Sequence, residues 1–258
     1  VKATVTLATG AKLTADRVVL APGIDFDPVP GLTDPNAMPH AWKAGPQTVA
    51  LRRQIEAMPD GGVFAISIPL APYRCPPGPY ERASVVAAYL KVAKPRSKVL
   101  ILDANPDVTS KKGLFMKVWA DSYKGIIEYR PQSELRDVDA ANRTAVLEFD
   151  KVKADVLNVV PPHRAGNIAA QSGLKLVNNR WVDIDWLGME STSTPGIHVI
   201  GDAIFPAPTM PKSGHMANQH AKLAAAAIVN LMSGQPPSDA PLVMNTCYSF
   251  VDNVNVVH

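Results

Sequence analysis

The stretch Ile197-His198-Val199-Ile200-Gly201-Asp202 decides the fold. Its run of branched apolar residues is typical of a short buried strand, and the turn Ser193-Thr194-Pro195-Gly196 precedes it. A proline-broken loop follows Asp202, and residues 213–232 then predict one helix. A strand, a carboxylate at its carboxyl end and a following helix N-terminus form the crevice in which open α/β sheets bind ligands. The alternative is a surface aspartate that only closes a strand.

A second motif comes earlier, where a short apolar strand ends in the turn Ala21-Pro22-Gly23. Backbone can approach a ligand closely at such a turn. The pattern is similar to the second fingerprint of flavoproteins of the disulfide reductase type. These proteins carry a small-x-Gly turn midway and a strand ending in Gly-Asp later, in this order. The order therefore predicts an FAD site that uses Ala21, Pro22, Gly23, Gly201 and Asp202.

The same resemblance implies an opening strand followed by a Gly-x-Gly-x-x-Gly turn, which holds a pyrophosphate at a helix N-terminus. This chain has no such turn. It begins at Val1 in an alternating strand pattern, without a start methionine or a basic leader. We therefore expect an N-terminal portion to be missing and the first domain to be incomplete. The chain also stops in strand-like sequence at His258, which predicts an incomplete C-terminal region.

Composition narrows the class of protein. The chain has 258 residues, 47% of them hydrophobic, and a formal net charge of +3. No cluster of lysine and arginine interleaves with aromatic residues, so a nucleic-acid partner is not expected. The most apolar helical stretch, residues 221–232, is too short to span a bilayer, and we expect no transmembrane segment.

The alternation of strands and helices predicts an α/β protein with two Rossmann-like dinucleotide-binding domains. We expect a partial FAD-binding domain at residues 1–60, a central NAD-binding-like domain at 61–185, a return to the first domain at 186–235 and the start of a C-terminal α+β region at 236–258. The expected elements are strands at 1–7, 62–68, 98–102, 126–129 and 156–160, helices at 46–58, 81–92 and 114–122, and a hairpin turn at 139–143.

A nicotinamide nucleotide is not expected in the central domain. The strand at 62–68 runs into a loop with five prolines within residues 69–79. Proline removes backbone donors and fixes φ, so this loop cannot hold a pyrophosphate. Asp103, which ends the next strand, is therefore interpreted as an ordinary strand-end residue.

The chain has two cysteines, Cys75 in the proline-rich loop and Cys247 near the end. Three interpretations remain open on the residues alone: a structural disulfide, two unrelated buried thiols, and a redox-active pair. Closing so long a loop is nominally worth about 5 kcal/mol through chain entropy, so stability alone would justify a disulfide.

Four motifs, at residues 73–84, 160–166, 198–203 and 210–214, carry a more specific resemblance. The first reads Tyr-Arg-Cys-Pro-Pro-Gly-Pro-Tyr-Glu-Arg-Ala-Ser. Together they resemble the flavin-binding subunit of flavocytochrome c sulfide dehydrogenase over essentially the whole chain. The resemblance implies a redox-active disulfide between Cys75 and Cys247 over the flavin ring. It also implies FAD as cofactor, a partner subunit that carries a c-type haem, electron transfer to that subunit, and a periplasmic location.

The chemistry so implied is sulfide oxidation, because hydrosulfide attacks an exposed or strained cystine by thiol-disulfide exchange. Glu81, at a helix start six residues after Cys75, is a candidate for moving protons near the sulfurs. Its alternative role is that of an acid stabilised by the helix dipole. Lys212, Ser213 and Gly214 form a helix start that favours negative charge on a reduced flavin.

No metal site is predicted, because His215 and His220 are five residues apart on one helix and do not share a face. Two alternative functions remain. One is a sulfide:quinone oxidoreductase, which adds amphipathic membrane-binding helices to similar chemistry. The other is a non-catalytic, flavin-free scaffold subunit or fragment.

Overall fold

The computed structural model describes residues 3–258; Val1 and Lys2, at the start of the first predicted strand, lie outside this range. The chain forms two compact units, and each unit is built from two separate stretches of the sequence. Unit 1 contains the chain up to Asp25 and His163–Cys247. Unit 2 contains Phe26–Pro162 and Tyr248–His258.

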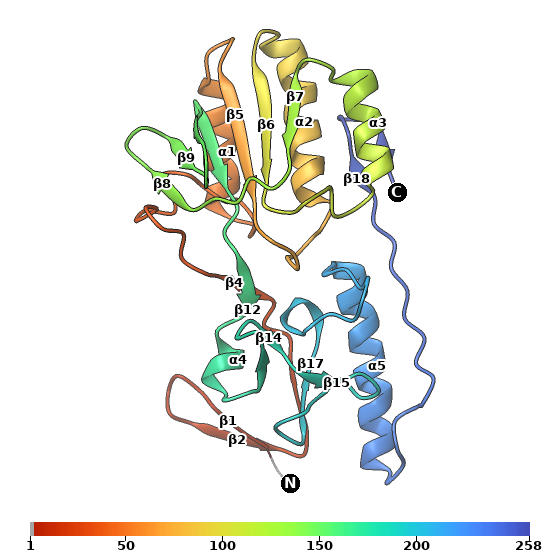
Figure 1. Ribbon diagram of the computed structural model, residues 1–258. Coiled ribbons are helices and arrows are strands. Elements are labelled where there is room, and N and C mark those ends of the chain that lie inside the picture. The colour runs from red at the N-terminus through yellow and green to blue at the C-terminus, as the bar shows by residue number, and fades with distance from the viewer. Residues whose placement is uncertain (1–2) are drawn as a thin grey trace. The chain divides into compact units, whose positions relative to one another are not determined.

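Unit 2 is built on a parallel sheet with the strand order β11-β5-β6-β7. Strand β5 (Val63–Ile68) leads through helix α2 (Gly78–Ala93) to β6 (Lys98–Asp103), and helix α3 (Lys112–Ser122) leads to β7 (Ile127–Arg130). Strand β11 (Val156–Val159) then returns to the other side of β5. Figure 1 shows β5, β6 and β7 side by side with α2 alongside them. The order reverses between β5 and β11, and this reversal is where open α/β sheets bind ligands.

The two faces of this sheet are covered differently. Helix α1 (Pro46–Ala57) packs near β11, and Trp119 of α3 donates a hydrogen bond to Ser84 of α2. The opposite face packs on a small antiparallel sheet of β8 (Asp137–Asp139), β9 (Thr144–Val146) and β10 (Lys151–Lys153). Alternating side chains of β5 and β6 enter that second layer, because successive residues of a strand point to opposite faces. Its buried core includes Met38, Ala65, Leu100, Leu102, Val138, Ala145, Val152, Leu157 and Val159.

The last segment of the chain completes unit 2. Strands β18 (Ser249–Phe250) and β19 (Val256–Val257) form a hairpin beside α2. The Tyr123 hydroxyl donates to the carbonyl of Val251 over 2.5 Å, and the Lys111 ammonium donates to Ser249 and to the carbonyl of Val257.

Unit 1 contains a four-stranded sheet with the order β15-β16-β17-β3. Strand β17 (Ile197–Val199) runs parallel to β3 (Val18–Leu20), while β16 (Glu190–Ser191) and β15 (Ile184–Asp185) continue it in antiparallel fashion. Helix α5 (Gly214–Met232) follows the short 3-10 helix η1 (Gly201–Ala203). The smaller elements are the hairpins β1–β2 (Ala3–Thr6, Lys12–Ala15) and β13–β14 (Leu176–Val177, Trp181–Val182), the pair β4–β12 (Ile24–Phe26, His163–Ala165) and helix α4 (Ile168–Gln171).

The α/β fold class is confirmed, and each predicted helix and strand overlaps an observed one. The compact units change over at residues 25/26, 162/163 and 247/248, whereas the predicted domain limits are 60, 185 and 235. The reason is packing: α1 lies against β11, so residues 26–60 join unit 2. Among residues 3–258, no helix combines the length and the hydropathy that a membrane crossing requires.

Candidate functional site

Cys75 lies in the loop that follows β5, at the carboxyl end of the sheet beside the strand-order reversal. In a dinucleotide-binding unit this position belongs to the glycine turn that holds the pyrophosphate. Here the proline-rich loop occupies it, as the sequence predicts. The site chemistry of unit 2 therefore depends on what surrounds this cysteine.

The backbone at Cys75 is left-handed, with φ of +59°, which is uncommon for a residue with a side chain. The Cys75 carbonyl accepts a hydrogen bond from Gly78 N, closing a tight turn into α2. A Cβ at residue 78 would lie 2.9 Å from the Cys75 sulfur and 3.1 Å from the Trp42 ring. Glycine at 78 thus leaves room for the thiol and the indole to approach the helix start.

A pair of reciprocal contacts ties this loop to the segment before α1. The Trp42 indole donates to the Arg74 carbonyl over 3.0 Å, and the Arg74 guanidinium donates back to the Trp42 carbonyl. Arg82 of α2 stacks on the Trp42 ring, with its guanidinium carbon 4.6 Å from the ring centroid. The same guanidinium donates to the His40 and Ala41 carbonyls and to the Asn158 amide oxygen over 2.6–2.8 Å.

A cavity of about 410 Å³ opens at Cys75. Burial lowers the pKa of Arg82 to about 10, and attraction to Cys75 opposes that shift. Burial, together with the nearby cations Arg82, Lys43 and Arg74, lowers the pKa of His40 to about 4. The cavity thus combines a thiol with cationic and apolar walls, and its lining residues are Ala41, Trp42, Arg74, Cys75, Gly78, Glu81, Arg82, Val85 and Val86.

Glu81 lies in the first turn of α2 and lines the same cavity as Cys75, so the structure brings these two predicted residues together. One of its carboxylate oxygens accepts a hydrogen bond from Phe250 N over 2.9 Å. Glu81 therefore fastens β18 to α2, a role that the sequence interpretation did not include.

In unit 1 the two predicted flavin motifs lie on neighbouring parallel strands. Val199 pairs with Leu20, and Ile200 N donates to the Leu20 carbonyl. The turns Ala21-Pro22-Gly23 and Gly201-Asp202 therefore leave the sheet at the same edge. Gly23 and Gly201 have φ values of +65° and +74°, which side chains rarely adopt.

Lys212 is buried behind these turns. Its ammonium donates to the carbonyls of Asp202 and Ile204 and lies 3.6 Å from the centroid of the Trp181 ring. Burial lowers the pKa of Lys212 to about 7, with Asp202 opposing the shift. The ammonium thus holds the Gly-Asp turn from behind.

Helix α5 starts where the sequence predicts, and Ser213 caps it. The Ser213 hydroxyl accepts a hydrogen bond from Met216 N over 3.0 Å and donates to the Asn245 side chain. The Asn245 amide in turn donates to the Cys247 sulfur over 3.3 Å. The Asn245 side chain therefore contacts both Ser213 and Cys247, so these two predicted site residues lie close together.

Among residues 3–258, the buried polar atoms of unit 1 without a hydrogen-bond partner include Trp181 Nε1 and His220 Nε2. Gly201 N donates to Nδ1 of His220, so the ring carries its proton on Nε2. Two N–H donors and a lysine ammonium beside the Gly-Asp turn fit the carbonyl and ring-nitrogen acceptors of a flavin. His215 Nδ1 accepts from Thr246 N instead.

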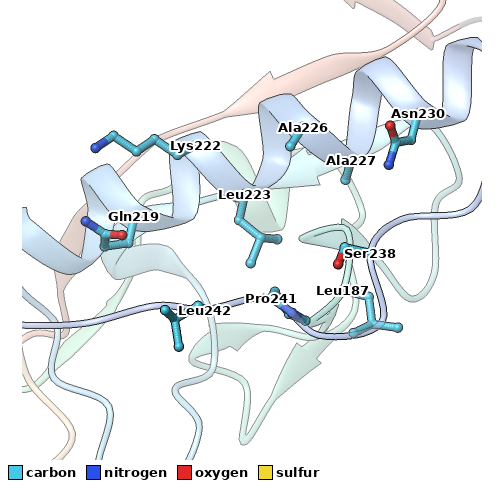
Figure 2. A pocket seen from close by; sticks show the side chains of 10 residues that line it. All are labelled: Leu187, Gln219, Lys222, Leu223, Ala226, Ala227, Asn230, Ser238, Pro241 and Leu242. Atoms are coloured by element: carbon cyan, nitrogen blue, oxygen red, sulfur yellow. The ribbon is translucent and has the colours of Figure 1, made fainter.

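Unit 1 has a cavity of its own, of about 280 Å³, between α5 and the segment that follows it (Figure 2). Leu223 points from the helix toward Pro241. None of the predicted site residues lines this cavity, whose walls are Leu187, Gln219, Lys222, Leu223, Ala226, Ala227, Asn230, Ser238, Pro241 and Leu242.

Cys75 and Glu81 belong to unit 2, and the predicted flavin residues and Cys247 belong to unit 1. The pairing of Cys75 with Cys247 stays a prediction. Sequence reasoning missed Trp42 and Arg82 at the thiol and Trp181 and His220 at the flavin turns. No local pattern marks them, since each contacts a segment far away in the sequence.

Residues 48–161 match the model of the central region of the flavoprotein chain of flavocytochrome c sulfide dehydrogenase. This match contains the whole Cys75 loop, and it confirms the resemblance over these residues, which include the first of the four motifs.

Solved structures share the fold. The sulfide:quinone oxidoreductase of Aquifex aeolicus is similar at 19% identity and a TM-score of 0.78, covering 96% of this chain and 62% of that one. A chain of the Tetrahymena thermophila mitochondrial ATP synthase is similar at 18% identity and a TM-score of 0.73, covering 98% of this chain and 65% of that one. The NAD-dependent persulfide reductase of A. fulgidus is similar at 15% identity and a TM-score of 0.60, covering 94% of this chain and 44% of that one. This chain thus spans less than two thirds of each of these neighbours.

Proposed function

We propose that this chain is part of a flavin-dependent oxidoreductase that takes up sulfide sulfur at Cys75. The observation that carries the proposal is the cavity at Cys75, in which a thiol on a left-handed turn meets two arginines and a carboxylate. The match of residues 48–161 to the sulfide dehydrogenase family supports it.

The proposed first step is a thiol-disulfide exchange on a bond between Cys75 and Cys247. Hydrosulfide attacks Cys75 Sγ, the S–S bond breaks, a persulfide forms on Cys75, and Cys247 leaves as a thiolate. The Arg82 guanidinium stabilises negative sulfur at this wall of the cavity. Glu81, on the same wall, takes the proton of the incoming sulfur species.

The proposed cofactor is FAD, held in unit 1 by Ala21, Pro22, Gly23, Gly201 and Asp202. When bound, a flavin accepts two electrons and passes them on singly to a one-electron acceptor. Lys212, Ser213 and Gly214 supply positive charge and a helix N-terminus to its pyrimidine edge. Trp181 and His220 add their buried N–H donors.

The proposed acceptor is a c-type cytochrome subunit, and the proposed location is the periplasm. The second candidate acceptor is a quinone, favoured by the fold shared with the Aquifex aeolicus sulfide:quinone oxidoreductase. Anaerobic turnover with sulfide, assayed separately with cytochrome c and with a soluble quinone, distinguishes the two.

The decisive experiment is the visible spectrum of the purified protein before and after sulfide is added without oxygen, with Cys75→Ser alongside. We expect flavin bands that bleach with sulfide only when Cys75 is present. Equal bleaching of both proteins contradicts the role of Cys75. A colourless protein contradicts flavin-dependent activity of this chain and favours the scaffold alternative.

A further inference from the structure

Asp103, which ends β6, does more than close a strand. Its side chain is fully buried, at 0% exposure, and both carboxylate oxygens accept hydrogen bonds. In a dinucleotide-binding unit an acid at the end of the second strand takes a ribose hydroxyl. Here the partners of the carboxylate come from the protein itself.

One oxygen of Asp103 organises the first half of the proline-rich loop. Oδ1 accepts from the backbone N and the side-chain amide of Asn105, over 2.9 and 2.8 Å. The Asn105 amide then donates to the Pro69 carbonyl and accepts from Ala71 N, each over 3.0 Å. Asn105 thus holds the segment that leaves β5.

The other oxygen organises the second half. Oδ2 accepts from the Tyr80 hydroxyl over 2.7 Å. The Tyr80 oxygen accepts from Thr109 N over 3.1 Å, and the Thr109 hydroxyl lies 2.8 Å from that of Tyr73. Tyr73 then donates to the Pro76 carbonyl over 3.4 Å. This chain of hydroxyls ends on the residues that flank Cys75.

Cys75 therefore lies between two anchors that share one carboxylate. The loop has few backbone donors of its own, because residues 69, 72, 76 and 77 are prolines. An uncommon backbone conformation persists only where its surroundings fix it. The two anchors fix the left-handed turn that places the thiol in the cavity beside Arg82.

We infer that Asp103 is a positioning residue for Cys75, acting through Asn105 on one half of the loop and through Tyr80 on the other. The inference deepens the proposed function and rests on it for its chemical meaning. The geometric part stands on the hydrogen bonds alone. Because both oxygens are occupied by this network, the carboxylate does not bind a nucleotide ribose in this state.

The test is the pH dependence of alkylation of Cys75 by iodoacetamide, in a Cys247→Ser background that leaves a single thiol. The variants are Asn105→Ala, Tyr80→Phe and Asp103→Ala. Tyr129→Phe is the matched control, because the Tyr129 hydroxyl donates to the same oxygen of Asp103, over 3.1 Å, from β7 and not from the loop.

Asn105→Ala and Tyr80→Phe are each expected to raise the pH midpoint of alkylation by about half a unit, which lowers the rate below the midpoint about threefold. The reason is that a loosened loop moves the thiolate away from the Arg82 guanidinium. Asp103→Ala should shift the midpoint at least as far. Tyr129→Phe should leave it in place.

The midpoint separates positioning from general loosening, since greater access raises the plateau rate without moving the midpoint. Unmoved midpoints in Asn105→Ala and Tyr80→Phe, or an equal shift in Tyr129→Phe, overturn the inference. Circular dichroism identifies a variant that does not fold, and the two milder variants then decide. Alkylation requires neither sulfide nor flavin, so failure of the proposed function and failure of this inference give different results.

Discussion

Pro22, in the middle of the Ala-Pro-Gly turn, leaves no room for a side chain at residue 166. A Cβ there would lie 2.6 Å from the Pro22 carbonyl oxygen and 2.8 Å from its Cβ. Gly166→Ala is therefore expected to displace the turn and to lower the free energy of unfolding by about 1–3 kcal/mol. Urea denaturation followed by circular dichroism measures the loss of stability. The flavin absorbance of the purified protein measures whether the displaced turn still binds the cofactor.

Gly113→Ala is the control for that substitution. Residue 113 lies in α3 with nothing within 4 Å of the added Cβ, so alanine should stabilise the helix by up to about 1 kcal/mol. If Gly166→Ala is as stable as the unchanged protein, the contact with Pro22 does not constrain the turn.

Lys212 gives unit 1 a pH-dependent stability. Its pKa is lowered to about 7 in the folded chain, while an unfolded lysine titrates near pH ~10.4. Between these values the unfolded chain binds a proton that the folded chain does not, so stability rises with pH, by at most about 1.4 kcal/mol per unit. We expect the wild type to gain stability relative to Lys212→Met between pH 7 and pH 9. Urea denaturation at both pH values checks this, and parallel pH profiles would refute it.

At the residue scale the sequence identified the motif residues but not their partners. The Gly-Asp and Ala-Pro-Gly turns were predictable because left-handed backbone selects glycine locally. The interpretation of Asp103 as a strand-end residue did not include its hydrogen-bond partners, because Tyr80 and Tyr129 are 23 and 26 residues away. Hydrogen bonds between distant segments leave no spacing pattern in one sequence.

Among the elements, helix α1 depends on a lysine that lies outside it. The buried ammonium of Lys94 donates to the carbonyls of Ile55, Glu56 and Met58 at the end of α1. Lys94→Met is expected to cost about 2 kcal/mol, since charged hydrogen bonds are lost and helix-end carbonyls lose their donor. Thermal unfolding measures the loss.

Arg52→Met is the comparison on the same helix. Arg52 pairs with Glu56 one turn away, and both side chains are exposed. Exposed ion pairs of this kind contribute little to stability, so this variant should remain close to the wild type. Equal losses in the two variants would show that Lys94 does not secure the end of α1.

The elements themselves were largely predictable, and their ends were less so. Helix α2 begins at Gly78, three residues before the predicted start, because proline is tolerated in the first turn of a helix. The antiparallel sheet of β8, β9 and β10 was visible only through its hairpin turn. Its strands have three residues each, too few for an alternating pattern to be recognised.

For the whole molecule, the segment between α5 and β18 should be the first site of proteolysis. Leu242 and Met244 are 92% and 62% exposed there, and no helix or strand holds the segment. Thermolysin is expected to cut near these residues. The fragment that carries residues 248–258 should remain bound to unit 2 through Lys111, Tyr123 and Glu81.

Size-exclusion chromatography followed by mass spectrometry measures whether the fragments stay together after cleavage. Lys111→Met should release more of the small fragment, because it loses two of the contacts. First cleavage inside β5 or β6, or immediate loss of the fragment from the unchanged protein, would contradict the proposed anchoring.

At this scale the sequence predicted the α/β fold class correctly, and the expected return of the chain to its first domain stays a prediction. It did not predict that residues 26–60 and 248–258 pack in unit 2. Those assignments depend on long-range contacts, such as α1 with β11 and Glu81 with Phe250 N. The hydrophobic periodicity and the positions of glycine and proline describe one segment at a time, and they do not reveal which distant segments pack together.

The return of residues 248–258 to unit 2 has a consequence for biosynthesis. A ribosome makes most of unit 2 before it makes most of unit 1, because residues 26–162 precede 163–247. Residues 163–247 of unit 1 are made before the hairpin of β18 and β19, which belongs to unit 2. Domains fold as units during synthesis. Residues 26–162 of the unit that carries Cys75 are therefore made before most of unit 1, and its hairpin of β18 and β19 is made only after Cys247.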